Sequence, residues 1–210
     1  KSYFGSCKVE VTGTPVRREF QDLPSVAEAR IRFGLSSEKP VVLCFGGSQG
    51  ARALNSMVVE AAKVLGEEIQ WLQVAGRDDE QRVRKLAGTR NGHVVLGFCD
   101  DMPAAYAASD LVISRSGGAS LTELAYLGMP SILVPYPHAA DDHQTYNARC
   151  FEKAGAALLA PEEEINAVSL AKLVGGLLGS PGDLSSMKVA ARGLSVDDAA
   201  ARICDMLEPD

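Results

Sequence analysis

The amino-acid sequence predicts an α/β protein with a Rossmann-like parallel sheet of about six strands and flanking helices. From residue 40 onward, short apolar runs alternate with helix-like segments, which is the pattern of strands joined by right-handed helical crossovers. The runs are apolar almost throughout, as are strands buried on both faces of a parallel sheet. The chain has 210 residues, 46% of them hydrophobic, which suffices for one sizeable core.

Six apolar runs are the predicted strands: Val41–Phe45, Ile69–Val74, His93–Leu96, Leu111–Ser114, Ser131–Val134 and Ala156–Leu159. Helix-like segments lie between them, near residues 53–66, 78–87, 102–109, 119–128 and 143–154. The tail from about 166 to 208 predicts two or three helices, because Gly-Ser-Pro-Gly at 179–182 is a helix-breaking sequence.

The first forty residues do not follow this rhythm. Lys8–Val11 predicts one strand, residues 12–17 a turn, and residues 18–39 an irregular or partly helical approach to the sheet. We therefore divide the chain into a lead-in segment at 1–39, the remnant of an interdomain linker, and a ligand-binding domain at 40–208. The chain begins with Lys rather than Met, and we expect a processed chain or a fragment whose preceding half is absent.

The composition excludes several classes of protein. The net charge is −6 and there is no basic run, which argues against a nucleic-acid partner. No apolar stretch approaches the roughly 20 residues that a membrane-spanning helix needs. The five cysteines are scattered and odd in number, and none forms a Cys-x-x-Cys pair. We therefore expect a reducing cytosol and no disulfide framework.

The most informative sequence is the glycine loop Gly46–Gly50, which joins the first predicted strand to the first helix of the sheet. Backbone N–H groups at a helix start, together with the helix dipole, bind a phosphate without a lysine. We therefore predict that this loop is an anion site that binds phosphate through its backbone N–H groups. The loop is neither a P-loop nor a Gly-x-Gly-x-x-Gly, and the second strand ends without the acidic residue that holds an NAD ribose.

Two other interpretations of this loop stay open. Gly46–Gly50 fits the Gly-x-Ser-x-Gly elbow of serine hydrolases, with Ser48 as nucleophile and Asp141 or Asp142 with His143 as partners. However, Ser48 would then follow the first strand of the alternating region instead of several, and no histidine follows His143. The remaining alternative is a purely structural glycine turn.

A second strand–glycine–helix segment, Ser114–Glu123, adds a carboxylate to the same plan. Two such loops in one sheet indicate a ligand with a diphosphate and a sugar. Gly117 and Gly118 permit a ligand to approach closely, and Glu123 would accept hydrogen bonds from two ribose hydroxyls. Alternatively, Ser120–Glu123 is a capping box in which the glutamate bonds only the start of its own helix. The spacing does not decide between the two.

Three more polar features have both a functional and a structural interpretation. His138–Gln144 suits a metal by residue type, but a polar loop that binds sugar hydroxyls fits its place after a strand better. Phe98–Met102 supplies either an Asp N-cap for the next helix or a backbone edge that reads a flat base. Arg17 and Arg115 are either cations near a diphosphate or solvated surface residues.

Five sequence blocks occur in a fixed order. They are Gly46-Gly-Ser-Gln-Gly-Ala-Arg-x-Leu-Asn55, Phe98-x-Asp-Asp-Met102-x-x-x-Tyr106, Arg115-Ser-Gly117…Glu123, Gly128-x-Pro130…Val134-Pro135 and Asp142-His-Gln144…Asn147-Ala148…Glu152-Lys-Ala-Gly-Ala156. Together they resemble the MurG family, the peptidoglycan GlcNAc transferases among the GT-B glycosyltransferases. The match covers roughly residues 8–205 and corresponds to the C-terminal, donor-binding half of the GT-B fold.

The resemblance implies transfer of GlcNAc from UDP-GlcNAc to the lipid I carrier, which gives lipid II with inversion at the anomeric carbon, in cell-wall synthesis. It implies no metal and no cofactor, because helix dipoles and N–H groups stabilise the departing UDP. In the family, the acceptor loops, the membrane-facing patch and the general base belong to the N-terminal half. We therefore expect no catalytic residue here and no transfer by this chain alone. The full-length protein is expected to be peripheral on the cytoplasmic face of the plasma membrane.

Carried over position by position, the resemblance implies a donor site with six parts. These are the diphosphate loop (Ser48, Gln49, Gly50), cations near the nucleotide (Arg17, Arg115), the uracil contacts (Phe98, Cys99, Met102), the ribose carboxylate (Glu123), the phosphate–sugar junction (Gly118, Ala119, Ser120) and the GlcNAc hydroxyl contacts (His143, Gln144). The family often has Gln-Gln where this chain has His143-Gln144, and the loop at 137–142 is slightly longer than in some members.

Two further alternatives belong to other classes. One is a natural stand-alone subunit that pairs with a separate acceptor subunit, as in the split eukaryotic dolichol-linked GlcNAc transferase. The other is a UDP-sugar-binding module without enzymatic activity.

Overall fold

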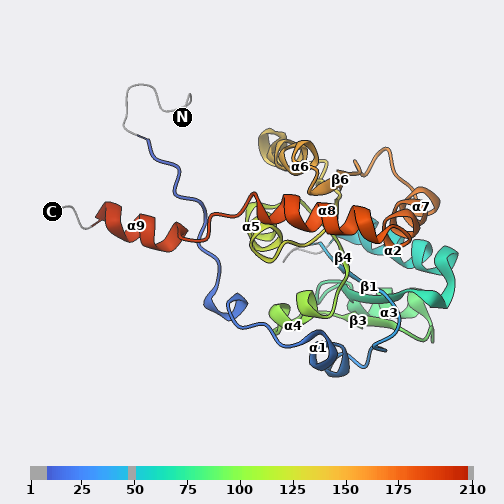
Figure 1. The fold of residues 1–210 in the computed structure, drawn as a ribbon. Helices are drawn as coiled ribbons and strands as arrows, with labels where there is room; N and C mark the ends of the chain where they lie inside the picture. The colour runs from blue at the N-terminus through green and yellow to red at the C-terminus, as the bar shows by residue number, and fades with distance from the viewer. Residues whose placement is uncertain (1–8, 47–50, 208–210) are drawn as a thin grey trace.

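The computed structural model describes residues 9–46 and 51–207, in which six parallel strands form one sheet in the order β3-β2-β1-β4-β5-β6 (Figure 1). The strands are β1 (Val41–Phe45), β2 (Gln70–Val74), β3 (His93–Leu96), β4 (Leu111–Ser114), β5 (Ser131–Leu133) and β6 (Ala157–Leu159). Each strand end differs from its predicted position by at most one residue. The predicted Rossmann-like sheet is confirmed.

Helices cover both faces of this sheet. One face carries α1 (Val26–Arg32), α4 (Met102–Ala107), α5 (Gly118–Leu127) and α6 (His143–Lys153). The other carries α2 (Arg52–Leu65), α3 (Glu80–Ala87) and α7 (Ala167–Leu178). α8 (Pro181–Arg192) contributes Ala191 to the core of the first face and Met187 to that of the second. Short 3₁₀ turns are η2 (Arg18–Phe20), η3 (Gly66–Glu68) and η4 (Ala140–Asp142).

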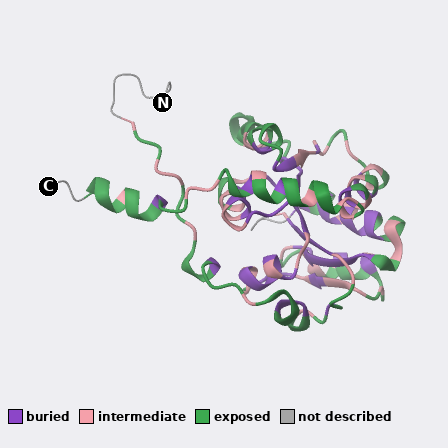
Figure 2. Ribbon diagram, viewed as in Figure 1, coloured by how far each residue is buried: buried purple, intermediate pink, exposed green. Residues whose placement is uncertain are grey.

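Strand β1 shows why the sheet has a core on each face. Its five residues are all buried. Val41, Leu43 and Phe45 belong to the core under α4 and α5, whereas Val42 and Cys44 belong to the core under α2 and α7. Successive side chains of a strand point to opposite faces, so a continuous apolar run fills both cores. Figure 2 shows this burial concentrated on the strands and on the inward faces of the helices.

The strand order reverses next to β1. This strand pairs with β2 on one side and with β4 on the other, and the chain moves outward from it in both directions. Open α/β sheets bind ligands in the crevice outside the carboxyl ends of the strands at such a reversal. The two glycine segments singled out in the sequence follow β1 and β4, the two strands that flank it.

The lead-in segment differs in part from the prediction. Residues 9–11 form no strand, so the predicted strand at Lys8–Val11 is wrong over the described residues; Val11 is 65% exposed and pairs with no neighbouring strand. The partly helical approach is confirmed by η2 and α1. Phe20, Ala29 and Leu35 are buried in the core under α4.

The tail forms three helices, of which the last is α9 (Ala199–Leu207). The predicted break at 179–182 is too long, because Pro181 is the first residue of α8. A proline is tolerated there since the first helical N–H has no partner within the helix. The link from α8 to α9 crosses the lead-in segment at Gly13, where an added Cβ would lie 2.7 Å from the Cβ of Val196 (Figure 1). None of the helices in the described ranges is long and apolar enough to cross a lipid bilayer.

Candidate functional site

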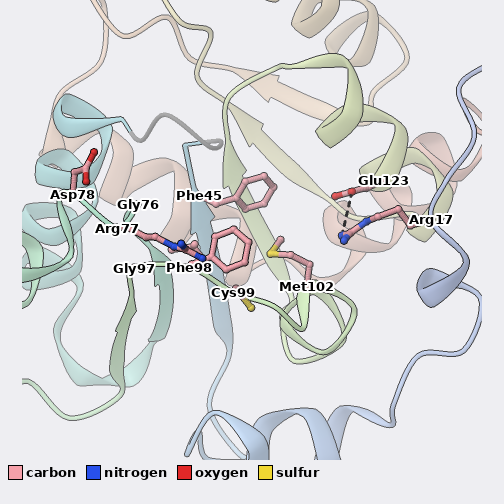
Figure 3. Close-up of a pocket in the computed structure, with 11 residues that line it drawn as sticks. Arg17, Phe45, Gly76, Arg77, Asp78, Gly97, Phe98, Cys99, Met102 and Glu123 are labelled. Atoms are coloured by element: carbon pink, nitrogen blue, oxygen red, sulfur yellow. Dashed lines mark ion pairs between the residues drawn. The ribbon is translucent and has the colours of Figure 1, made fainter.

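A cavity of about 720 Å³ opens at the carboxyl ends of β1, β2 and β3, beside the point where the strand order reverses. Its volume is in the range that holds a small organic ligand. Its lining comes from the lead-in segment, three strand ends, the start of α4 and the second turn of α5 (Figure 3). The lining residues are Arg17, Phe45, Val74, Gly76, Arg77, Asp78, Gly97, Phe98, Cys99, Met102 and Glu123.

One end of the cavity is formed by the carboxylate of Glu123, whose side chain is 19% exposed. Tyr106 donates its hydroxyl to Glu123 Oε2 at 2.9 Å. Arg17 Nη2 lies 3.7 Å from Glu123 Oε1, the ion pair that Figure 3 marks with a dashed line. Burial raises the pKa of Glu123, while the hydrogen bond from Tyr106 and the charge of Arg17 oppose that rise. This carboxylate therefore has one short hydrogen bond and one oxygen that faces a partner beyond hydrogen-bond distance.

The capping-box interpretation of Glu123 is wrong. Helix α5 has Gly117 as its N-cap and no side-chain hydrogen bond at that position. Ser120 lies inside the first turn instead of at the cap, so the reciprocal bonds of a capping box do not form. The bonds of Glu123 run to Tyr106 in α4 and toward Arg17 in the lead-in segment.

The other end of the cavity is aromatic and cationic. Phe98 is 53% exposed, and the guanidinium of Arg77 lies 4.7 Å from the centroid of its ring (Figure 3). Cys99 is buried beside it, and this burial raises the pKa of its thiol. Asp101 caps α4 by accepting a hydrogen bond from Ala104 N at 3.0 Å. The cap and the cavity wall are thus both present, on neighbouring residues of one segment.

The starts of α5 and α6 lie next to each other but outside this cavity. Ser116 Oγ donates to Gln144 O at 2.7 Å, and Asn147 Nδ2 donates to Ser116 O at 3.1 Å. Gln144 Oε1 accepts from Tyr136 N at 3.0 Å. These bonds tie the segment after β4 to the segment after β5, so the two helix starts keep a fixed relation.

The predicted residues at these helix starts are accessible. Gly118, Ala119 and His143 are exposed, and an added Cβ at Gly118 would meet nothing within 4 Å. His143 Nδ1 lies 2.7 Å from Ala140 O. The turn before it holds Asp141 and Asp142 at φ of 50° and 51°, a conformation that L-residues other than asparagine and aspartate seldom adopt.

The structure does not place Arg115 with the cavity residues. Its guanidinium is buried and donates to Val134 O at 3.1 Å, Pro135 O at 2.9 Å and Glu162 Oε2 at 2.5 Å. Its donors therefore cross-link the end of β4 to the segments after β5 and β6.

Ser48, Gln49 and Gly50 lie outside the described residues. The two ends of their segment are close together, because a Cβ added at Gly46 would lie 2.3 Å from the Cβ of Ala51. Gly46 therefore permits an approach of the end of β1 to Ala51 that a residue with a Cβ would obstruct. Among the described ranges, no group of three or more His, Cys, Asp or Glu side chains is arranged to hold a metal ion.

Five predicted site residues meet in the cavity, and the sequence analysis missed six others. The five are Arg17, Phe98, Cys99, Met102 and Glu123; the six are Phe45, Val74, Gly76, Arg77, Asp78 and Gly97. Gly76 and Gly97, each within two residues of the end of a predicted strand, were a usable signal, because ligands in parallel sheets bind at strand ends. The contact between Tyr106 and Glu123 joins segments that the sequence keeps apart, and no local pattern indicates it.

A second carboxylate, the buried Asp79 at the N-cap of α3, has hydrogen bonds to both of its oxygens. It accepts from Asn55 Nδ2 at 2.9 Å and from Arg82 Nε and Nη2, each at 2.6 Å. The hydrogen bond from Arg82 lowers the pKa of Asp79 to about 2. Asn55 also donates to Ala75 O at 2.8 Å and so ties α2 to the end of β2.

The family described as "Glycosyltransferase family 28 C-terminal domain" matches residues 41–203. Two relatives are named UDP-N-acetylglucosamine–N-acetylmuramyl-(pentapeptide) pyrophosphoryl-undecaprenol N-acetylglucosamine transferase. The protein from Syntrophotalea carbinolica is 41% identical over 199 residues, which cover 92% of this chain and 53% of the relative. The protein from Myxococcus xanthus is 38% identical over 210 residues, covering 98% and 53%. The chain thus spans about half the length of these relatives.

Two solved structures match most of this chain and about half of their own length. The crystal structure of Acinetobacter baumannii MurG matches with a TM-score of 0.74 and 32% identity, and the match covers 81% of this chain and 52% of that one. A UDP-GlcNAc 2-epimerase from Neisseria meningitidis, bound to UDP-GlcNAc, matches with a TM-score of 0.60 at 15% identity, covering 86% and 47%. At that identity the second match concerns the fold alone.

Proposed function

Because the chain belongs to the glycosyltransferase family 28 C-terminal domain, we propose that it binds the UDP-GlcNAc donor of an inverting GlcNAc transferase. The transferase would convert lipid I into lipid II in peptidoglycan synthesis, the reaction for which its relatives are named. One observation carries the proposal at the level of the site. A cavity beside the strand reversal has a carboxylate with an open oxygen at one end and an exposed aromatic wall at the other.

The cavity accounts for the nucleoside. Uracil would lie against Phe98 and Met102, with its edge on the backbone near Cys99. The ribose hydroxyls would donate to Glu123, whose Oε1 has no hydrogen bond from the described residues. Arg17, which is 52% exposed beside Glu123, would lie near the nucleotide and add positive charge.

The diphosphate and the sugar would lie toward the two helix starts. We propose that the backbone of 47–50, with Ser48, Gln49 and Gly50, and the junction at Gly118, Ala119 and Ser120 bind the diphosphate. Helix dipoles and N–H groups would then stabilise the departing UDP without a metal. His143 and Gln144 would contact the GlcNAc hydroxyls. Arg115 would support the site without contacting the ligand, because its hydrogen bonds to Val134, Pro135 and Glu162 hold the end of β4 against the segments after β5 and β6.

The remaining half of such a transferase would supply the acceptor side. We propose that residues 40–208 are the donor domain and that 1–39 lead into it from the acceptor domain. That domain would carry the lipid I site, the general base and the surface that rests on the cytoplasmic face of the membrane. If the acceptor site belongs instead to a separate subunit, transfer also needs that partner. In either case the chain alone would bind the donor without transferring GlcNAc.

Calorimetric titration of the chain with UDP-GlcNAc, UDP, UDP-glucose and ADP-glucose tests the proposal. We expect the uridine ligands to bind in the presence of EDTA and ADP-glucose not to bind. Equal affinity for ADP-glucose, loss of binding in EDTA, or no binding of any uridine ligand at millimolar concentration would contradict it.

A further inference from the structure

Tyr106 contacts two residues of the cavity wall, Phe45 and Glu123, and only 1% of its surface is exposed. Its ring meets Phe20 and Phe45 edge to face, with centroid separations of 5.8 and 5.9 Å. Its hydroxyl donates to Glu123 Oε2 at 2.9 Å. Two aromatic rings therefore fix the direction of the tyrosine, and the hydroxyl at its tip is aimed at one oxygen of the cavity carboxylate.

The other oxygen of Glu123 is held more loosely. Arg17 Nη2 lies 3.7 Å from Oε1, beyond hydrogen-bond distance. The guanidinium of Arg17 lies 4.9 Å from the centroid of the Phe20 ring. Tyr106, Glu123, Arg17 and Phe20 thus form a closed ring of contacts, in which Oε2 accepts a hydrogen bond and Oε1 accepts none from the described residues. Figure 3 shows the Arg17–Glu123 pair of this ring at the cavity.

We infer that Tyr106 is a positioning residue, which fixes the carboxylate of Glu123 so that it accepts hydrogen bonds from the vicinal hydroxyls of the donor's ribose. The inference rests on the proposed function, since it names the part of the cavity that reads the ribose.

The last torsion of a glutamate side chain is broad and nearly two-fold, so an unrestrained carboxylate samples many planes. A hydrogen bond to one oxygen selects one plane, and this lowers the entropy that binding of the two hydroxyls would otherwise lose. In addition, a hydrogen bond to the ionised form favours ionisation and so opposes the effect of burial.

The charged and titratable groups that face this carboxyl come from two parts of the described chain. Tyr106 approaches from α4 and Arg17 from the lead-in segment. Glu19 lies 4.0 Å from Arg17 Nε and partly offsets its charge. Arg77, Asp78 and Cys99 line other parts of the cavity wall. Tyr106 is the one whose hydrogen bond to Glu123 an isosteric substitution can remove.

The first test compares UDP with 2′-deoxy-UDP by calorimetry, for the unchanged chain and for Tyr106→Phe. Phenylalanine keeps the ring between Phe20 and Phe45 and removes only the hydroxyl. We expect the unchanged chain to prefer UDP. Tyr106→Phe should weaken UDP binding about tenfold and leave 2′-deoxy-UDP binding within about twofold. Tyr126→Phe is the matched control, because its ring contacts Arg192 on α8 and does not line the cavity.

The second test measures UDP-GlcNAc affinity between pH 4.5 and 8, a range in which its diphosphate diester does not titrate. We expect affinity to fall on acidification as Glu123 is protonated. In Tyr106→Phe the midpoint of this fall should move to higher pH, because Glu123 loses a hydrogen bond that lowers its pKa. Glu123→Gln should remove the fall, and Tyr126→Phe should leave the midpoint unchanged.

Equal loss of UDP and 2′-deoxy-UDP affinity in Tyr106→Phe, with an unmoved midpoint, would mean that the tyrosine supports only the fold and would overturn the inference. Unchanged affinity for both ligands would overturn it as well. Failure of the unchanged chain to bind UDP would overturn the proposed function and, with it, this inference.

Discussion

Two carboxylates border the carboxyl edge of the sheet, the buried Asp79 and the half-buried Glu123, and they are bonded in opposite ways. Asp79, at the start of α3, accepts three short hydrogen bonds from Asn55 and Arg82. Glu123, in the second turn of α5, accepts one from Tyr106 and faces Arg17 at 3.7 Å. Their side chains are 7% and 19% exposed, so burial alone does not explain the difference.

This difference indicates that Asp79 stabilises the fold, whereas Glu123 is available to bind a ligand. The pKa of Asp79 is lowered to about 2, chiefly by its bond to Arg82, and the folded state gains from its charge. The pKa of Glu123 is raised by burial, so the folded state loses from its charge. A group that folding leaves short of hydrogen bonds in a cavity is a candidate to complete them with a ligand.

The largest effect should come from Asp79→Ala. It leaves Arg82 and Asn55 without their acceptor, and breaking a buried pair costs about 3 kcal/mol. We expect the free energy of unfolding in urea to fall by that amount. UDP-GlcNAc affinity of the folded fraction should change little. Asp22→Ala, an exposed aspartate, is the matched control. A change below about 0.5 kcal/mol in Asp79→Ala would break the comparison on the structural side.

The contributions of Asp79 and Glu123 to the free energy of unfolding should change with pH in opposite directions. The contribution of Asp79 is present above its unfolded pKa of 3.8 and is lost as pH falls through about 2; it amounts to about 2 kcal/mol. Glu123 has a raised pKa, so its contribution is present below the unfolded value of 4.5 and is lost as pH rises through the folded pKa.

These opposite signs are measurable in variants. Relative to the unchanged chain, Asp79→Asn should lose stability increasingly from pH 2 to pH 5. Glu123→Gln should gain relative stability from pH 4 to pH 7. Urea denaturation across this range checks both, and equal pH slopes for the two variants would contradict the assignment.

Substitution of Glu123 should lower ligand affinity more than substitution of Asp79 does, whereas the order is the opposite for stability. Glu123→Gln should weaken UDP-GlcNAc binding at least tenfold at pH 8, because hydrogen bonds to a charged acceptor are lost. Its unfolding free energy at that pH should not decrease. Glu152→Gln on α6, an exposed glutamate, is the matched control for calorimetry. If Glu123→Gln destabilised the chain and bound the donor normally, the comparison would fail on the ligand side.

The smallest effect should come from Arg17→Ala. Arg17 is 52% exposed and lies beyond hydrogen-bond distance from Glu123, so its removal should change the unfolding free energy by less than about 0.5 kcal/mol. Donor affinity should fall a few-fold at low salt and less at high salt, because exposed charges are screened. A large loss of thermal stability would show that Arg17 belongs with the structural ion pairs.

The sequence predicted the sheet well because its strands are short apolar runs buried on both faces. Val41–Phe45 is such a run, and its two faces fill two cores. Lys8–Val11 has a strand-like composition, but residues 9–11 have no neighbouring strand to bond, which no local pattern can reveal. Pro181 was read as part of a break, although a proline fits equally well at the first position of a helix.

Cavity residues that belong to a sequence motif could be predicted from the sequence. Contacts between segments that are distant in the sequence could not. The segment around Phe98 and the carboxylate Glu123 line the cavity, and the sequence indicated both because each follows a predicted strand. The burial of Arg115 against Glu162 depends on the packing of β4, β5 and β6. Arg77 was missed because a single arginine after a strand resembles any surface residue until its stacking on Phe98 is seen.

The most direct test of the central claim is a crystal structure of this chain with UDP bound. We predict that the uracil lies in the cavity beside Phe98 and that both ribose hydroxyls lie within hydrogen-bond distance of Glu123. A nucleotide bound outside this cavity, or one whose ribose points away from Glu123, would contradict the assignment of this carboxylate to the ligand.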